Sequence, residues 1–231
     1  MIGIIGAMDI EVRALCGMLT DARIETHSGT QFHVGRLGDC PVVIARSGIG
    51  KVAAAVCAEA MLLVYKPQLL INTGVAGALS CELSIGDMVV SSCAVQYDMD
   101  TSPLGDPVGF LSGIDRIRLM ADEDAVTRLA DAAKATGAHA LVGTVASADR
   151  FVASREEKER IVRLFPDALC CEMEGGAIAH AACLNGTPFV ILRAISDTAD
   201  DSSHMDYPTF VAHAAETSTR TVVEFLRCHT R

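Results

Sequence analysis

The sequence predicts a three-layer α/β sandwich in which a mixed central sheet is flanked by helices on both faces. Short runs rich in Ile and Val alternate with longer segments of helical period. Residues 2–5 and 190–192 are apolar without alternation, as is typical of strands that are covered on both faces. The 231 residues are 50% hydrophobic and 21% charged, which suits a packed globule rather than a disordered chain. No repeat or linker-like segment divides them, so we expect one domain over residues 1–231.

The first half of the chain is expected to open with a strand and a helix and to include a locally antiparallel part. Gly29 and the Gly38-Asp39 pair are turn residues between the early strands. Pro67 ends the second helix, because the residue before a proline is driven out of the helical region. In order, the elements expected up to residue 95 are strand 2–7, helix 10–19, strand 31–36, strand 42–47, helix 51–65, strand 68–73 and strand 87–95.

The second half has helix boundaries with a clear physical cause. Gly137 suits the left-handed position that follows a helix. Ser154 and Glu157 have the spacing of a capping box, in which each side chain satisfies a free amide of the first helical turn. The elements expected after residue 120 are helix 123–136, strand 140–147, helix 155–164, strand 169–172, helix 176–184, strand 189–194 and helix 209–228.

Residues 97–114 lack any periodicity and contain Pro103, Pro107 and several glycines. Loops of this length in a compact domain are usually functional or disordered. Its apolar residues, which include Leu104 and Phe110, do not suit simple exposure to water. One interpretation is that this loop packs on a second subunit.

Composition excludes several classes of partner. The formal charge is −10, with 29 acidic against 19 basic residues and no basic cluster, so nucleic acid is not an expected partner. The longest apolar stretch, residues 52–65, is interrupted by Glu59 and falls short of the roughly 18 residues of a membrane span. The nine cysteines include no C-x-x-C pair, which favours reduced thiols in a cytoplasm over disulfides or a metal site. The amino terminus lacks the pattern of a secretory signal.

Four polar or glycine-rich clusters each follow a predicted strand. They are residues 8–11, residues 74–77, residues 173–176 and residues 196–197. Open α/β sheets bind ligands beyond the carboxyl ends of their strands, so these clusters are expected to converge on one pocket. The glycines, Gly77 among them, allow backbone amides to approach a small ligand, although neither the G-x-G-x-x-G nor the Walker pattern is present.

Each cluster also has a purely structural interpretation. Glu11 lies in a first helical turn, where an acid complements the helix dipole, and residues 74–77 could be only a tight turn. Glu172 and Glu174 need donors if they are buried, and these are either sugar hydroxyls or an arginine. Arg193 and Asp197 have the spacing of a same-side pair on a regular strand. Phe151 is either a core residue or a platform for stacking.

Taken together, five motifs resemble those of the bacterial 5′-methylthioadenosine/S-adenosylhomocysteine nucleosidases. The motifs are GIIGAM at 3–8 followed by Glu11, SGIGKVAAA at 47–55, NTGVAG at 72–77, EME at 172–174 and RAISD at 193–197. The resemblance covers residues 1 to about 227, in order. It implies the nucleoside phosphorylase-like α/β fold, a homodimer, no cofactor or metal, and a role in methionine salvage.

The resemblance also implies a mechanism. The members hydrolyse the N-glycosidic bond to adenine in methylthioadenosine and S-adenosylhomocysteine, and 5′-deoxyadenosine is a further candidate substrate. Asp197 matches the acid that protonates N7 of adenine, and Glu11 matches the base that activates water. Arg193 matches the residue that helps to orient that water. Thr101 and Leu104 match positions that reach the partner chain's site.

The remaining site residues are expected to bind substrate. Glu174 matches the residue that holds the ribose hydroxyls, with Met173 against the sugar, which requires the strand to end or bend by Met173. Phe151 matches the aromatic residue that stacks on adenine. The Val152 backbone matches the backbone segment that forms hydrogen bonds with the edge of the base. The full expected binding set is Met8, Ile49, Gly77, Phe151, Val152, Glu172, Met173, Glu174, Ser196 and Tyr207.

Two departures from the family pattern bear on the 5′ substituent: Val75 stands where many members have serine, and Tyr207 replaces a common phenylalanine. Three alternatives stay open. A purine nucleoside phosphorylase on this fold would need cations around phosphate, and in such enzymes arginines stand near the positions of Glu11 and Asn72. An aminodeoxyfutalosine hydrolase would share the same carboxylates. A noncatalytic nucleoside sensor would not require both Glu11 and Asp197.

Overall fold

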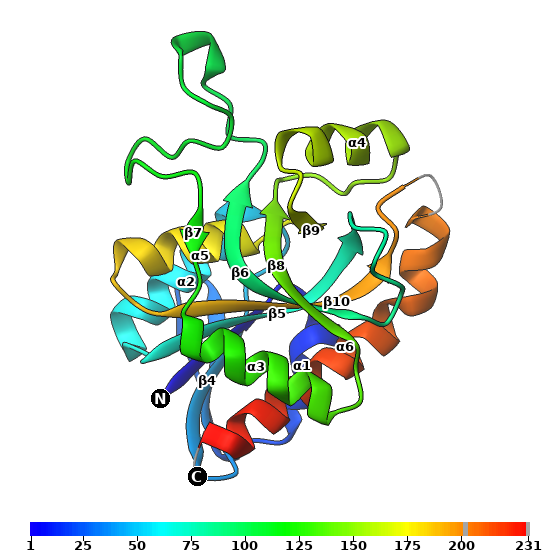
Figure 1. Ribbon diagram of the computed structural model, residues 1–231. Coiled ribbons are helices and arrows are strands. Elements are labelled where there is room, and N and C mark those ends of the chain that lie inside the picture. Colours follow the sequence, from blue (N-terminus) through cyan, green and yellow to red (C-terminus); the bar gives the residue numbers. More distant parts are fainter. Residues whose placement is uncertain (201–202, 230–231) are drawn as a thin grey trace.

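The computed structural model describes residues 1–200 and 203–229, and it forms the predicted mixed α/β architecture (Figure 1). In chain order the elements are β1 (Ile2–Gly6), α1 (Asp9–Gly17), β2 (Thr20–His27), β3 (Thr30–Leu37), β4 (Cys40–Arg46), α2 (Lys51–Tyr65), β5 (Leu69–Ala78), β6 (Met88–Gln96), the 3₁₀ helix η1 (Ser102–Leu104), β7 (Leu119–Met120), α3 (Glu123–Ala135), β8 (Ala140–Ser147), α4 (Arg155–Leu164), β9 (Ala168–Glu172), α5 (Gly175–Leu184), β10 (Phe189–Asp197) and α6 (Ser203–His229).

The described strands form one mixed sheet in the order β10-β6-β8-β9-β5-β1-β4-β3-β2, with β7 beside β6. The central β5 pairs in parallel with β1 and also with β10. Because β10 pairs with β6 as well, the five strands β5, β10, β6, β8 and β9 form a closed ring within the sheet. The predicted antiparallel part is confirmed in β2, β3 and β4, which turn back at Gly29 and Gly38. Strand β5 is therefore the strand on which both halves of the sheet meet.

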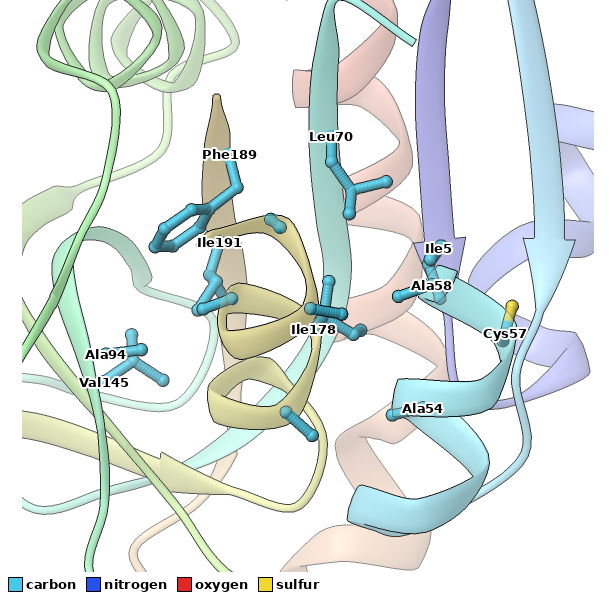
Figure 2. Packing of buried hydrophobic residues seen from close by; sticks show 14 of the residues in the cluster. Ile5, Ala54, Cys57, Ala58, Leu70, Ala94, Val145, Ile178, Phe189 and Ile191 are labelled. Atoms are coloured by element: carbon cyan, nitrogen blue, oxygen red, sulfur yellow. The ribbon is translucent and has the colours of Figure 1, made fainter. Parts of the chain in front are cut away.

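Helices bury both faces of the sheet, as the non-alternating strands predicted. On β1, Ile5 packs with α2 and α5 in one buried cluster, and its neighbour Ile4 packs with α1, α3 and α6 in another. Figure 2 shows Ala54, Cys57 and Ala58 of α2 and Ile178 of α5 on the side of Ile5 and Leu70. Helix α4 covers a third cluster near the ends of β8 and β9. Two-sided burial explains why β1 and the first four residues of β10 carry no polar side chain.

The predicted helix ends were correct where a physical stop signal was available. Helix α2 ends at Tyr65, followed by Lys66 in the left-handed region and then Pro67. Gly137 has a φ of +81° after α3. At the start of α4 the Ser154 hydroxyl accepts a hydrogen bond from the Glu157 amide at 3.3 Å. No helix within residues 1–200 or 203–229 has the length and apolar content needed to cross a bilayer.

Several expectations about the elements and their bounds were wrong. Strand β2 was not predicted, because its residues are mostly exposed and lack an apolar face; the two-residue β7 was also missed. Strand β5 was expected to end at residue 73 but runs on through residues 74–77, because β10 and β9 pair with that stretch. Helix α6 begins at Ser203 rather than after Pro208, so the proline lies inside the helix.

Residues 97–118 extend away from the body between β6 and β7 (Figure 1). The loop contains η1 and is anchored by the buried Leu111. By contrast, the Leu104 side chain is 84% exposed. Some apolar residues of this loop, such as Leu111, are therefore buried against the same chain, whereas Leu104 projects away from it.

Candidate active site

Two buried carboxyl groups adjoin strand β5 at Gly74 and Gly77. A Cβ atom at Gly74 would lie 2.5 Å from Glu11 Oε1, and one at Gly77 would lie 2.7 Å from Asp197 Oδ1. A side chain at either glycine would collide with a carboxylate, so these positions need glycine for close approach rather than for a turn. The two glycines are three residues apart, which is roughly 10 Å along a strand. Members of all four clusters line one cavity, as expected, although two of the clusters lie within strands.

Glu11 is held at the start of α1 by three backbone amides. Its Oε2 accepts from the amides of Ala7 at 2.7 Å and Met8 at 2.9 Å, and its Oε1 accepts from the amide of Val75 at 3.1 Å. Burial raises the pKa of Glu11, while the charge of Arg193 and these amides oppose the rise. Glu11 does cap its helix, as the structural alternative supposed, but the carboxylate also faces a cavity.

Asp197 ends β10 and is fixed by its sequence neighbours. Its carboxylate accepts from the Ser196 hydroxyl and from the Ala199 amide, each at 2.9 Å. Burial raises the pKa of Asp197, and these hydrogen bonds oppose the rise. A carboxyl group with a raised pKa keeps its proton closer to neutral pH, as a general acid requires.

Arg193 does not pair with Asp197, so the structural pair considered as one alternative is not formed. A register shift between Ile195 and Asp197 interrupts the alternation of β10. The Arg193 guanidinium instead forms a salt bridge with Glu172 and donates to Asn72 Oδ1 at 2.5 Å. The Arg193 side chain is fully buried beneath the cavity and is not part of its lining.

Glu172 is satisfied almost completely by donors of the protein. Its Oε2 accepts from the amides of Glu174 at 3.0 Å and Gly175 at 2.7 Å as well as from Arg193, and its Oε1 accepts from Ser147. Although burial acts to raise the pKa of Glu172, the charge of Arg193 and these hydrogen bonds lower it. Of the two alternatives for Glu172, the contacts match the structural ion pair.

Glu174 differs from Glu172 because it is buried with few donors. The Gly50 amide donates to its Oε1 at 2.8 Å, and this is the one hydrogen bond found from a described residue to the carboxylate. Burial and the nearby charge of Glu172 raise the pKa of Glu174 to about 7. Strand β9 ends at Glu172 and the chain bends at Met173, as the family pattern required. The bend leaves the Glu174 carboxylate directed to the cavity.

These groups share one cavity of about 360 Å³, within the usual size of a small-molecule site. Phe151 is 45% exposed and not a core residue; its ring meets that of Tyr207 edge to face at 5.5 Å between centroids. The expected residues that line this cavity are Met8, Glu11, Ile49, Gly77, Phe151, Val152, Glu172, Met173, Glu174, Ser196, Asp197 and Tyr207.

Arg193, Thr101 and Leu104 lie outside that lining. Sequence reasoning had not assigned Arg150 or Cys171 to the cavity, although Arg150 directly precedes Phe151 and Cys171 directly precedes Glu172. It also missed Ser147, which carries no motif signal. Within the described parts of the chain, no three His, Cys, Asp or Glu side chains are arranged to hold a metal ion.

The geometry agrees with comparisons to known proteins. A family model described as the phosphorylase superfamily matches residues 1–227. A 5′-methylthioadenosine/S-adenosylhomocysteine nucleosidase of Staphylococcus carnosus is 35% identical over 227 residues, which cover 98% of this chain and 99% of the relative. The chain belongs to this nucleosidase family.

Solved structures of the nucleosidase family have the same fold. The nucleosidase of Neisseria meningitidis in complex with methylthio-immucillin-A has a TM-score of 0.95, at 33% identity and with 98% of each chain covered. A futalosine hydrolase mutant of Helicobacter pylori has a TM-score of 0.93, at 31% identity and again with 98% of each chain covered. The predicted nucleoside phosphorylase-like fold and the predicted family are confirmed.

Proposed function

We propose that this chain hydrolyses the N-glycosidic bond of 5′-methylthioadenosine and S-adenosylhomocysteine, releasing adenine and a 5-thioribose sugar; 5′-deoxyadenosine is a further candidate. The bond between C1′ and N9 breaks, and its electron pair moves into adenine, which takes a proton at N7. A water oxygen bonds to C1′ and gives up its own proton. The observation that carries this proposal is the pair of buried carboxyl groups, Glu11 and Asp197, in one cavity of about 360 Å³.

Asp197 is proposed as the acid. Adenine leaves poorly as an anion, so a proton delivered to N7 lowers the barrier. The raised pKa of Asp197 supports this role, because the group retains a proton that an exposed aspartate would have lost. Its fixed position, set by Ser196 and Ala199, supports a directed transfer.

Glu11 is proposed as the base that takes the proton of the attacking water. Glu11 and Asp197 line the same cavity, and the proposal requires their carboxyl groups to flank the sugar and the attacking water, as in glycosidases that use separated carboxylates. Arg193 is buried next to the cavity without lining it, and it is proposed to act through its charge, which opposes protonation of Glu11 and of Glu172. We retain for it the positioning role toward water that the family pattern implies.

The other lining residues divide among the parts of the substrate. Glu174 is proposed to accept hydrogen bonds from the ribose hydroxyls, and its charge would stabilise the cationic sugar of the transition state. Phe151 and the Val152 backbone are proposed to bind adenine. Met8 and Tyr207 would contact the 5′ substituent, and the Tyr207 hydroxyl lies 3.1 Å from Met8 Sδ.

Phosphate is disfavoured as the nucleophile by the charges around the cavity. Four of the residues lining the cavity are Glu11, Glu172, Glu174 and Asp197, whereas Arg150 is the one cationic residue among the described lining residues, and it is paired with Glu157. Binding of phosphate needs several cationic donors. Water carries no charge and meets no such barrier.

A homodimer in the cytoplasm is proposed for the native protein. The projecting Leu104 and the exposed apolar side chains on α2, at Val52 (75%) and Leu63 (60%), support a covered surface. Thr101 and Leu104 are proposed to contact the partner's site. The nine cysteines include no C-x-x-C pair, which supports a reducing compartment, and the proposed substrate pair supports a role in methionine salvage. No nucleic-acid or membrane partner is proposed.

One chromatographic assay tests the activity. The purified chain is incubated with methylthioadenosine in phosphate-free buffer and again with added phosphate. Adenine and methylthioribose should form at equal rates in both, and a sugar 1-phosphate would assign phosphorolysis instead. Binding without product would indicate a sensor. Preferential cleavage of aminodeoxyfutalosine in a parallel reaction would favour the hydrolase alternative, to which the similarity to a futalosine hydrolase structure gives support.

A further inference from the structure

A second, more polar cavity lies beside the nucleoside cavity. Its volume is about 1070 Å³, and it is enclosed by α1, the turn between β2 and β3, and the end of β4. Ala7, Met8 and Ile49 line both cavities, so the two are neighbours across these three residues. We call this second cavity the outer groove. Met8 is proposed above to contact the 5′ substituent, and it lines both cavities, so the outer groove begins where that substituent would point.

Backbone hydrogen bonds fix the wall between the two cavities. The Ser47 amide donates to the Gly6 carbonyl at 2.9 Å, and the Gly48 amide donates to the Ala7 carbonyl at 3.1 Å. Arg46 is paired with Gly6 in the last register position of β4 against β1. These contacts place Arg46 at the rim of the outer groove on a rigid strand rather than on a mobile loop.

The charges of the outer groove suit a zwitterion. No hydrogen bond or ion pair joins the Arg46 guanidinium to any residue within the described part of the chain. The other lining arginine, Arg13, is occupied by Asp9, and both of its hydrogen bonds go to Asp9 Oδ2. Asp9 Oδ1 is thus left free to accept from an ammonium group. The outer groove offers one unpaired cation and one available carboxylate oxygen, both outside the nucleoside cavity.

We propose that the outer groove binds an α-amino acid carried on the 5′ sulfur, with the Arg46 guanidinium receiving its carboxylate and Asp9 its ammonium. This inference rests on the proposed function and adds a specificity residue to it. A methylthio group ends one atom beyond the sulfur and cannot reach Arg46. The amino acid tail of S-adenosylhomocysteine places three carbons between the sulfur and the carboxylate and extends into the outer groove.

The test compares two substrates on two variants. Initial rates with S-adenosylhomocysteine and with methylthioadenosine are measured for the native chain, for Arg46→Gln and for Arg163→Gln. Arg163 is an exposed arginine of α4 that contacts Glu159 and lies outside both cavities. In Arg46→Gln, the ratio of kcat/KM for S-adenosylhomocysteine to that for methylthioadenosine should fall by about five- to tenfold, as for loss of a charge-assisted hydrogen bond in a partly exposed site. The Arg163→Gln variant should keep the native ratio.

A third substrate separates charge from shape. A nucleoside with a 5′-(3-aminopropylthio) group has the same chain without the carboxylate, and its kcat/KM relative to methylthioadenosine should not depend on Arg46. An unchanged ratio for S-adenosylhomocysteine in Arg46→Gln, or an equal loss with the aminopropyl compound, would overturn the assignment of Arg46. If the native chain cleaves no nucleoside, the proposed function fails, and the affinity of Arg46→Gln for S-adenosylhomocysteine relative to methylthioadenosine then decides the binding proposal.

Discussion

Replacement of Glu174 by glutamine should make the protein more stable at alkaline pH and less active. Glu174 is 7% exposed, and its carboxylate accepts a hydrogen bond from the Gly50 amide and lies near the charge of Glu172. Glutamine has nearly the same shape and keeps an oxygen to accept the hydrogen bond from Gly50. It removes the buried charge, so the difference between the two proteins isolates the cost of ionising Glu174 in the fold.

The magnitude follows from the pKa of Glu174, which burial raises from an ordinary value of 4.5 to about 7. Such a rise corresponds to about 3 kcal/mol, since one pKa unit is about 1.4 kcal/mol. Between those two pH values the folded state binds more protons than the unfolded state, and the free energy of unfolding falls as pH rises. The contribution of Glu174 to stability is therefore present below about pH 4.5 and lost above about pH 7.

Denaturant unfolding of both proteins at about pH 5 and about pH 8, at one protein concentration, measures this effect. The free energy of unfolding of Glu174→Gln should exceed the native value by roughly 2 to 3 kcal/mol more at pH 8 than at pH 5. In thermal unfolding, the Tm of Glu174→Gln should exceed the native Tm by roughly 4 to 12 °C more at pH 8 than at pH 5, for a chain of this size. Glu82→Gln, at an exposed position, is the matched control and should show no such pH dependence. A difference that is equal at both pH values would refute a raised pKa for Glu174.

Three further perturbations test the rest of the site. Asp197→Asn and Glu11→Gln should each lower turnover by on the order of 10²–10⁴-fold. For the native protein, kcat/KM should decline as pH rises through the raised Asp197 pKa, and Asp197→Asn should remove this decline. It should also decline as pH falls through the raised Glu11 pKa, and Glu11→Gln should remove that decline. Variants whose profiles keep both declines would contradict the proposed roles of the two acids. Phe151→Ala should raise KM for adenosine-like substrates by roughly 5- to 100-fold, as for loss of one stacked base, and an unchanged KM would remove Phe151 from the adenine site. Gly74→Ala, whose Cβ would lie 2.5 Å from Glu11 Oε1, should lower turnover while circular dichroism shows a folded protein; native turnover would show that Glu11 can shift without consequence.

Local signals in the sequence predicted most of the fold. Apolar runs and helix stop signals such as Pro67 and Gly137 act over a few residues, so they can be recognised without knowledge of the partners. The extension of β5 through residues 74–77 depends instead on pairing with β10 and β9, which are far away in the sequence. Glycine-rich stretches that form strands by such pairing look like turns when they are considered alone.

The membership of the cavity was predictable, but the partners of its charged residues were not. The motifs at the strand ends gave Glu11, Glu174 and Asp197 because carboxyl ends of strands gather at one edge of a sheet. The pairing of Arg193 depends on a register shift in β10, and a one-residue change of register moves a side chain to the other face. No spacing rule within residues 193–197 contains that information.

The excess of carboxylates in the cavity makes sense only when the charge of the reacting sugar is considered. Arg193 is bound to Glu172, so it neutralises one of four acids in or beside the site and leaves Glu174 without a cationic partner. For the folded protein alone this arrangement is unfavourable, because burial and the charge of Glu172 oppose an ionisation of Glu174 that would be complete at neutral pH at its ordinary pKa. A sugar that becomes cationic as adenine leaves supplies the missing positive charge, and it does so only in the transition state, where stabilisation raises the rate. The expected gain in stability of Glu174→Gln and its expected loss of activity therefore have one cause, the removal of the unpaired charge of Glu174.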